Sequence, residues 1–155
     1  MNSTYRNFDS ILKIAAKGNV AQVQKLLQAN SSLLNRPSEG HNRTLLWEAV
    51  NSNRIELVKY LVKQGADVNI PGRYRSQTFV LLKPYCIAHK KKKEVVKNYL
   101  LSNGHSMDIF SIAYLKGKEE LLTLLANNKQ QVNRKQKEDK HWEVFPIHYL
   151  SLIHI

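Results

Sequence analysis

The chain has 155 residues, 43% of them hydrophobic, which is enough for one domain with a sizeable core. Its formal net charge of +12 is concentrated in residues 71–141, where 15 basic and 6 acidic residues leave a net of +9. No run of about eighteen apolar residues occurs, which excludes a transmembrane helix. Cys86 is the single cysteine, so an internal disulfide is excluded as well.

Residues 5–35 predict two short helices. Val23, Leu26 and Leu27 recur at helical spacing after a turn at Gly18. The segment begins with polar residues, which is typical of the unit that caps the end of a stack of repeated helix pairs.

Residues 40–70 predict a second and more regular helix pair. Ile55, Val58 and Leu61 recur at helical spacing and give its second helix one apolar stripe. Gly65 follows, where helices commonly end in a left-handed residue that glycine adopts without steric cost. Helices this short cannot bury their apolar faces alone, so further copies must stack on them.

Residues 44–69 resemble one ankyrin repeat, whose family pattern is roughly TPLHxAAxxGHxEVVxLLLxxGADVN. The matching residues are Thr44, Leu46, Ala49, Glu56, Val58, Leu61, Gly65, Ala66, Asp67, Val68 and Asn69. The resemblance implies an all-α solenoid of stacked helix-turn-helix units joined by finger loops. It also implies that partners dock on a concave face formed by the fingers and the first helices.

Weaker copies follow along the chain. Residues 106–133 repeat the pattern at an offset of 64 residues from residues 40–70, close to two periods of roughly 33 residues. Residues 78–105 form a degenerate copy between them. We place Pro84 near the start of its first helix, where the missing N–H costs least, and Glu94 at the start of its second.

Residues 142–155 look like half a repeat. Its apolar residues cover more than one face of the predicted helix, so we expect further chain or another subunit to cover it. The chain, residues 1–155, is therefore predicted to be one domain of about four helix pairs and a half repeat.

The second finger holds a first group of candidate partner contacts. Arg73, Tyr74 and Arg75 place two strong donors and an aromatic ring where we expect an exposed tip, and such residues are enriched at binding hot spots. The alternative, equally weighted, is a polar loop with Tyr74 packed back on the stack.

Two further groups complete the set. Trp47, Glu48 and Asn51 take positions that the ankyrin resemblance places in the groove, although Trp47 also suits the base of the groove with only its rim facing a ligand. The last finger repeats the basic and aromatic composition with Lys135, Lys137 and Trp142.

The sharpest charge feature is a run of four lysines, Lys90, Lys91, Lys92 and Lys93. In register, the run replaces the turn between the two helices of residues 78–105 and projects away from the fingers. It is interpreted as a solvated turn, with an anion contact or a nuclear-import-like cluster as the alternative.

No catalytic constellation emerges. Ser10 and Lys13 fit a Ser-x-x-Lys pattern, but the companion motifs of that enzyme class are absent. A nucleophile elbow, a phosphate-binding glycine loop and a His-Glu-x-x-His motif are also absent, and His148 and His154 are spaced wrongly for a metal pair on a helix. We therefore expect no enzyme activity, no cofactor and no metal site.

The sequence thus predicts a non-catalytic module that binds a protein partner, and the basic charge favours an acidic one. One alternative is salt-sensitive binding of nucleic acid or anionic lipid by the basic centre. Another is a targeting domain within a longer enzymatic or effector protein. The N-terminus has no signal-peptide pattern, so we expect a cytoplasmic location. Delivery into a host cell, as for ankyrin arrays of some intracellular bacteria, rests on analogy alone.

Overall fold

The computed structural model of the chain describes residues 3–74, 80–116 and 118–127. The helices in these residues are α1 (Ser3–Lys17), α2 (Val20–Ala29), α3 (Leu45–Asn51), α4 (Ile55–Lys63), α5 (Pro84–Lys90), α6 (Glu94–Ser102), α7 (Ile109–Lys116) and α8 (Lys118–Asn127). A short 3-10 helix (Ser31–Leu33) follows α2, and two short strands, β1 (Gly72–Arg73) and β2 (Leu81–Leu82), precede α5. The predicted all-α class with four helix pairs is confirmed.

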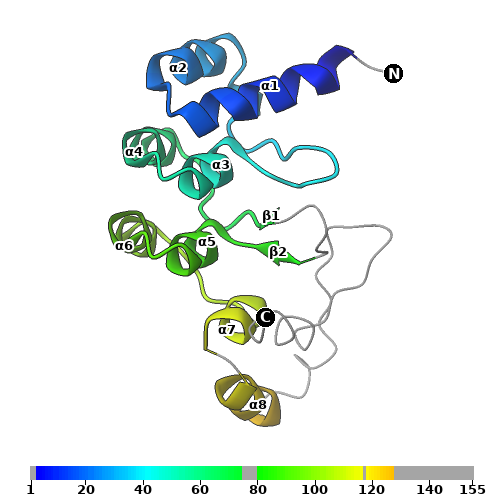
Figure 1. The fold of residues 1–155 in the computed structure, drawn as a ribbon, viewed down its shortest axis with the longest axis vertical. Helices are drawn as coiled ribbons and strands as arrows, with labels where there is room; N and C mark the ends of the chain where they lie inside the picture. Colours follow the sequence, from blue (N-terminus) through cyan, green and yellow to red (C-terminus); the bar gives the residue numbers. More distant parts are fainter. Residues whose placement is uncertain (1–2, 75–79, 117, 128–155) are drawn as a thin grey trace.

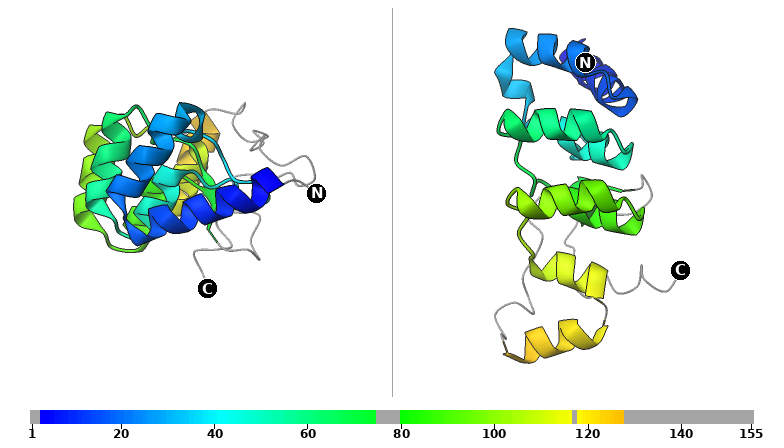
Figure 2. Two further views of the ribbon diagram at one scale, coloured as in Figure 1. Left: turned by 90° about the horizontal axis from the view of Figure 1, so that it is seen from above. Right: turned by 90° about the vertical axis from the view of Figure 1, so that its left-hand side faces the viewer.

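The helix pairs form a one-dimensional stack (Figure 1). The first helices α1, α3, α5 and α7 pack against one another in that order. The second helices α2, α4 and α6 form a parallel column on the left of Figure 1, which faces the viewer on the right of Figure 2. The loop before α3 and the strands β1 and β2 before α5 lie on the other side of the first helices in Figure 1. This side is called here the finger side. The core is therefore a continuous strip between repeats, as expected of a solenoid.

Each pair buries an equivalent set of apolar side chains. In the second pair, Leu46, Ala49, Leu57 and Leu61 are at most 1% exposed. Burying such a side chain contributes about 1.5–3 kcal/mol, and the neighbouring pairs supply the surfaces that cover it.

The fourth pair is arranged differently from the first three. In both Figure 1 and the right view of Figure 2, α8 lies below α7 instead of continuing the column of α2, α4 and α6. Helix α7 has apolar residues on all sides, including Ile109, Phe110, Ile112 and Leu115, so it can pack on α5 with one face and on α8 with another. Leu121 is the buried anchor of α8.

The turns within the first three helix pairs share one backbone conformation. Gly18, Asn53 and Lys92 each occupy the same place in this turn and have φ values of +78°, +57° and +54°. An L-residue reaches this left-handed region at a cost that glycine avoids. The lysine run therefore lies in an inter-helix turn, as predicted, and Lys92 stands where the first turn has glycine.

The second helix of the third pair, α6, begins at Glu94, as predicted. Val96 and Leu100 are buried, as Leu57 and Leu61 are in the second pair, so Glu94 takes the place of Ile55 and not that of Glu56. Val95 is 69% exposed as a result. The buried residues, and not the glutamate, therefore mark the face of α6 that packs on the stack.

Asparagines at the ends of the repeats tie each repeat to the next. Asn35 donates to the Gly65 carbonyl (3.3 Å) and accepts from the Asp67 backbone N–H (2.8 Å). Asn69 makes the same pair of bonds one repeat later, to the Gly104 carbonyl (3.0 Å) and from the Ser106 N–H (2.9 Å). These bonds satisfy backbone groups that the helix ends leave without helical partners.

The connections agree with the sequence expectations where they are described. β1 pairs antiparallel with β2, with Gly72 opposite Leu82 and Arg73 opposite Leu81, at the base of the second finger. Between α6 and α7 the described chain has no strand. Pro84 is the first residue of α5, also as predicted. The half repeat expected in residues 142–155 lies outside the described residues.

Candidate functional site

Trp47 is a structural residue, which corrects its assignment as a partner contact. Its side chain is fully buried, and its Nε1–H donates to the Leu82 carbonyl at 2.8 Å. A Cβ atom on Gly72 would lie 2.9 Å from Trp47 Nε1, so only glycine fits there without a shift. The indole thus fixes the β1–β2 hairpin of the second finger onto α3.

Arg43, which the sequence does not single out, also joins the β1–β2 hairpin to α3. Its Nε donates to the Arg73 carbonyl (2.8 Å) and its Nη2 to the Tyr74 carbonyl (3.1 Å). Its guanidinium lies 4.6 Å from the centre of the Trp47 ring and pairs with Glu48 at 3.4 Å. No sequence pattern marks this role, because two of the four partners, Arg73 and Tyr74, lie about 30 residues away in the sequence.

The exposed tip predicted for Arg73 and Tyr74 is wrong. Arg73 lies in β1, and its backbone N–H donates to the His41 carbonyl at 2.8 Å, which joins the second finger to the first. Tyr74 is half-buried and packs against the core, as the alternative interpretation held. Both residues lie at the base of the finger because β1 begins at Gly72. Arg75, Lys135, Lys137 and Trp142 lie outside the described residues.

Lys91 is not part of a solvated turn. Its Nζ donates to the backbone carbonyl of Asn51 (2.8 Å) and to the Asn51 side-chain oxygen (2.7 Å), in the preceding repeat. Partial burial lowers the pKa of Lys91, against the nearby charge of Glu48. Asn51 also donates to Glu48 at 3.2 Å, so its side chain serves the repeat junction.

Lys90 lies on the finger side, between two tyrosines. Its Nζ is 5.7 Å from the centre of the Tyr74 ring and 5.5 Å from that of Tyr114 on α7. These distances fall within the range of cation–π attraction. Lys90 is exposed, and both rings are half-buried. The structure therefore brings together two predicted site residues, Lys90 and Tyr74, with Tyr114, which the sequence analysis missed.

A hollow of about 320 Å³ lies on the finger side of the first two repeats. It is lined by Asp9, Leu12, Lys13, Ala16, Ser38, His41, Arg43 and Glu48. Glu48 lines this hollow, and its carboxylate is engaged by Arg43 and Asn51. Lys13 and His41 are exposed, so they remain accessible to a partner at this hollow.

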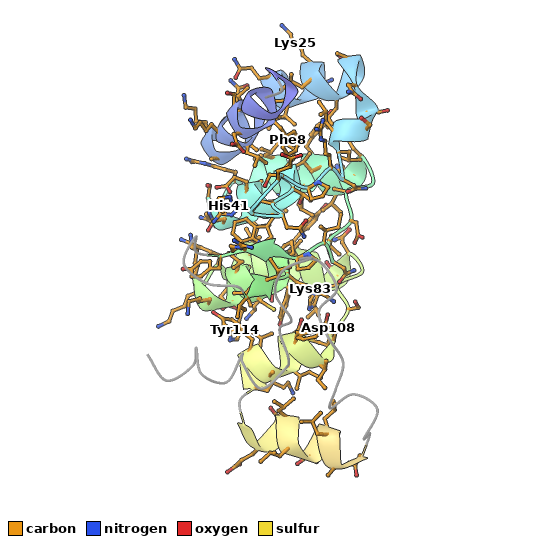
Figure 3. All side chains as sticks on the ribbon, turned by 90° about the vertical axis from the view of Figure 1, so that its right-hand side faces the viewer. Phe8, Lys25, His41, Lys83, Asp108 and Tyr114 are labelled. Carbon is orange, nitrogen blue, oxygen red and sulfur yellow. The ribbon has the colours of Figure 1, made fainter. Side chains whose placement is uncertain are left out.

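A half-buried ion pair joins the third and fourth repeats. Lys83 Nζ lies 3.0 Å from Asp108 Oδ2 and donates to the Ser106 carbonyl at 2.9 Å. Figure 3 shows both residues where α5 and α7 meet. Asp108 also caps α7, accepting from the Ser111 N–H at 2.8 Å. Although burial raises the pKa of Asp108, the bonds from Ser111 and Lys83 outweigh it and hold that pKa below its usual range.

The Cys86 thiol lies close to Lys83 and Asp108, between the third and fourth repeats, and is unreactive. Burial raises its pKa to about 12, so the thiolate that would be reactive is not formed near neutral pH. Cys86 is therefore a small residue of the core.

His105 stacks on Tyr85 between the same two repeats, with ring centres 4.2 Å apart and an angle of 10° between the planes. Both ring nitrogens are buried, and neither has a hydrogen-bond partner among the described residues. Burial, followed by the charge of Lys83, lowers the pKa of His105 to about 4. The folded state therefore holds the imidazole neutral.

We expect stability to fall by about 1–2 kcal/mol as the pH drops from 6.5 to 4, because the unfolded chain takes up a proton on His105 first. This contribution is fully present above pH 6.5. Denaturant unfolding across this range measures it. The variant His105→Phe, which keeps the stack on Tyr85, should flatten the pH dependence, whereas His89→Gln on the exposed side should not. An unchanged slope in His105→Phe would contradict the assignment.

The described residues hold no group of three or more His, Cys, Asp or Glu side chains that could bind a metal ion. None of the helices in this part of the chain has the length and apolar character needed to cross a membrane.

Comparison with known families identifies the repeat type. A family model for three copies of ankyrin repeats matches residues 1–71, which contain α1 to α4 and the first finger. Residues 1–71 of the chain are therefore ankyrin repeats. The stack of helix pairs, the finger hairpin and the asparagine links between repeats agree with this, and the described residues extend the repeat architecture to α8. Ankyrin repeats form protein-interaction modules.

A curated relative shares a short segment with this chain. Palmitoyltransferase AKR1 of Naumovozyma castellii is 43% identical over 53 residues, which is 34% of this chain and 7% of that protein. The similarity therefore extends over a small fraction of the relative's length. It does not carry the relative's activity to this chain.

Proposed function

We propose that the protein binds an acidic segment of a partner protein along its finger side, without catalysis. The observation that carries this proposal is the cluster of Lys90, Tyr74 and Tyr114, called here the Lys90 cluster. The two rings restrain an exposed ammonium group, so less side-chain entropy is lost when an anionic group binds it.

The rest of the finger side supports the same partner chemistry. Lys13 and His41 are exposed at the hollow between the first two repeats. Its lining also contains two acidic residues, Asp9 and Glu48, and Glu48 is paired with Arg43. A segment that reaches from this hollow to the Lys90 cluster would cross α3 and α5. The fingers that frame the path are held by Arg43 and Trp47, so little rearrangement is needed on binding.

Selection from a random peptide library, followed by affinity measurements on the enriched peptides, tests the proposal. We expect acidic peptides to be enriched, and Lys90→Glu to weaken them about tenfold or more, equivalent to about 1.4 kcal/mol. Lys92→Glu is the matched control, because it makes the same charge change in an exposed residue of the same run. It should change affinity less than about twofold, since rim charges at a distance contribute little.

Polyanion binding is the second candidate and an outcome of the same experiment. If both variants lose affinity equally and an oligonucleotide competes, the charge of the whole run is responsible. Affinity should then fall steeply with salt, because bound phosphates release counterions. The geometry favours the acidic segment, since Lys91 is engaged by Asn51 and Lys90 faces the fingers, so the run does not act as one patch.

A separate proposal is that these repeats are a targeting domain within a longer enzymatic or effector protein. The relative is a palmitoyltransferase, and an ankyrin array that positions an enzymatic region would fit a match confined to repeats. The Lys90 cluster would then select the substrate or scaffold of that region. Its test is the same loss of binding in Lys90→Glu.

A further inference from the structure

The column of second helices has a hollow of its own, on the side away from the fingers. It measures about 310 Å³ and is lined by Gln24, Leu27, Gln28, Ser31, Leu34, Tyr60 and Gln64. These residues come from α2, the 3-10 helix that follows it and the C-terminal end of α4. It is therefore built by two consecutive repeats and is separate from the finger-side hollow.

The lining carries no charged side chain, although the chain as a whole has a net charge of +12. Three glutamine amides, a serine hydroxyl and a tyrosine hydroxyl surround a floor that contains Leu27 and Leu34. Among the described residues, the side-chain amides of Gln24, Gln28 and Gln64 have no hydrogen-bond partner. Each amide offers both donors and an acceptor.

We propose that this hollow binds an uncharged, extended peptide segment of a partner protein. Gln24 and Gln28 lie four residues apart on α2, and Tyr60 and Gln64 lie four apart at the end of α4. Four helical residues rise about 6 Å, and two residues of an extended chain span about 6.6–6.8 Å. The two rows of polar groups thus nearly match the repeat of a peptide backbone, whose N–H and C=O groups they can pair.

The floor favours a peptide over a sugar. Leu27 and Leu34 offer aliphatic contact, and the one aromatic ring in the lining, Tyr60, is half-buried and packs against the core. A small aliphatic side chain of the peptide would lie on the leucines while its backbone pairs with the glutamines. Acidic or basic segments gain no ion pair here and lose their hydration.

The test uses the random peptide library again, selected at high salt to suppress binding driven by charge. The double variant Gln24→Lys and Gln28→Lys adds two charges to the lining. Lysine has nearly the same helix propensity as glutamine, so α2 should persist. The matched control, Gln22→Lys with Ala29→Lys, adds the same two charges at exposed positions of α2 outside the lining.

We expect enriched peptides without net charge that bind the native protein and the control equally, and the lining variant at least about tenfold more weakly. Lys90→Glu should leave this binding intact, which separates it from the proposed finger-side function. Equal binding to the lining variant and the control would overturn the proposal. Enrichment of acidic peptides only would also overturn it. A third contrary result would be that the protein binds a neutral oligosaccharide on an array through the glutamines while no peptide binds.

Discussion

Replacing Trp47 by alanine should lower the free energy of unfolding by about 3–5 kcal/mol. The indole extends from α3 and is fully buried against the hairpin and the Arg43 guanidinium, so its removal leaves a large cavity. It also leaves the buried Leu82 carbonyl without its 2.8 Å donor. Denaturant unfolding followed by far-ultraviolet circular dichroism measures the loss.

Two further variants separate packing from hydrogen bonding at this site. Trp47→Phe keeps most of the volume and removes the donor, so it should cost about 1–3 kcal/mol. Gly72→Ala should destabilise the native protein, because the added Cβ would lie 2.9 Å from Trp47 Nε1, and it should cost less when Trp47 is already alanine. Additive effects of the two changes would contradict the contact.

Replacing Lys83 by alanine should cost about 2–4 kcal/mol, because it leaves the Asp108 carboxylate half-buried without its cation. The loss should appear first in α7 and α8, since the ion pair joins them to the third repeat. Hydrogen exchange of the α7 amides would detect this local opening. The Asp108 carboxylate would also lose the partner that lowers its pKa.

The exposed pair Lys59 and Glu56 is the control for the buried one. Its side chains are 43% and 74% exposed, against 11% and 25% for Lys83 and Asp108. Lys59→Ala should therefore cost less than about 1 kcal/mol. In the double variant Lys83→Met with Asp108→Asn, the asparagine can still cap α7 and no unpaired charge remains, so most of the stability should return. A double variant as unstable as Lys83→Ala would contradict the ion-pair explanation.

Contacts between neighbouring repeats explain why several predicted contact residues have structural roles. The sequence predicts Trp47, Asn51 and Arg73 as candidate partner contacts. Each is instead engaged by a residue of a neighbouring repeat, at Leu82, Lys91 and His41 respectively. A repeat cannot bury its own faces, so many of its polar and aromatic residues serve the repeats beside it.

The regular elements were predictable because their signals are local. Helical spacing of apolar residues marks α4, Gly65 marks its end, and Pro84 marks the start of α5. The start of α6 at Glu94 was predictable in the same way, but its register was not, since Glu94 resembles Glu56 and takes the place of Ile55. A charged residue near a helix start fits either of two adjacent positions, and only burial of Val96 and Leu100 selects one.

The candidate site was predicted only in part. The resemblance placed the lysine run correctly at the turn between two helices, and Glu48 lines the finger-side hollow. It could not show that Lys90 and Lys91, neighbours in sequence, have different environments. One ammonium group lies beside two tyrosine rings and the other bonds to Asn51 in the preceding repeat. Successive residues at a helix end point about 100° apart, so their partners depend on what packs there.

The sequence by itself determined that the chain is a stack of short helix pairs, because helical periodicity and turn residues are written within each repeat. Only the tertiary structure decided which polar residues remain available for binding. That choice depends on contacts between residues about 30 to 40 positions apart, such as Arg43 with Tyr74 and Trp47 with Leu82. The finger-side Lys90 cluster and the glutamine-lined hollow are both formed in this way, since each draws its residues from more than one repeat.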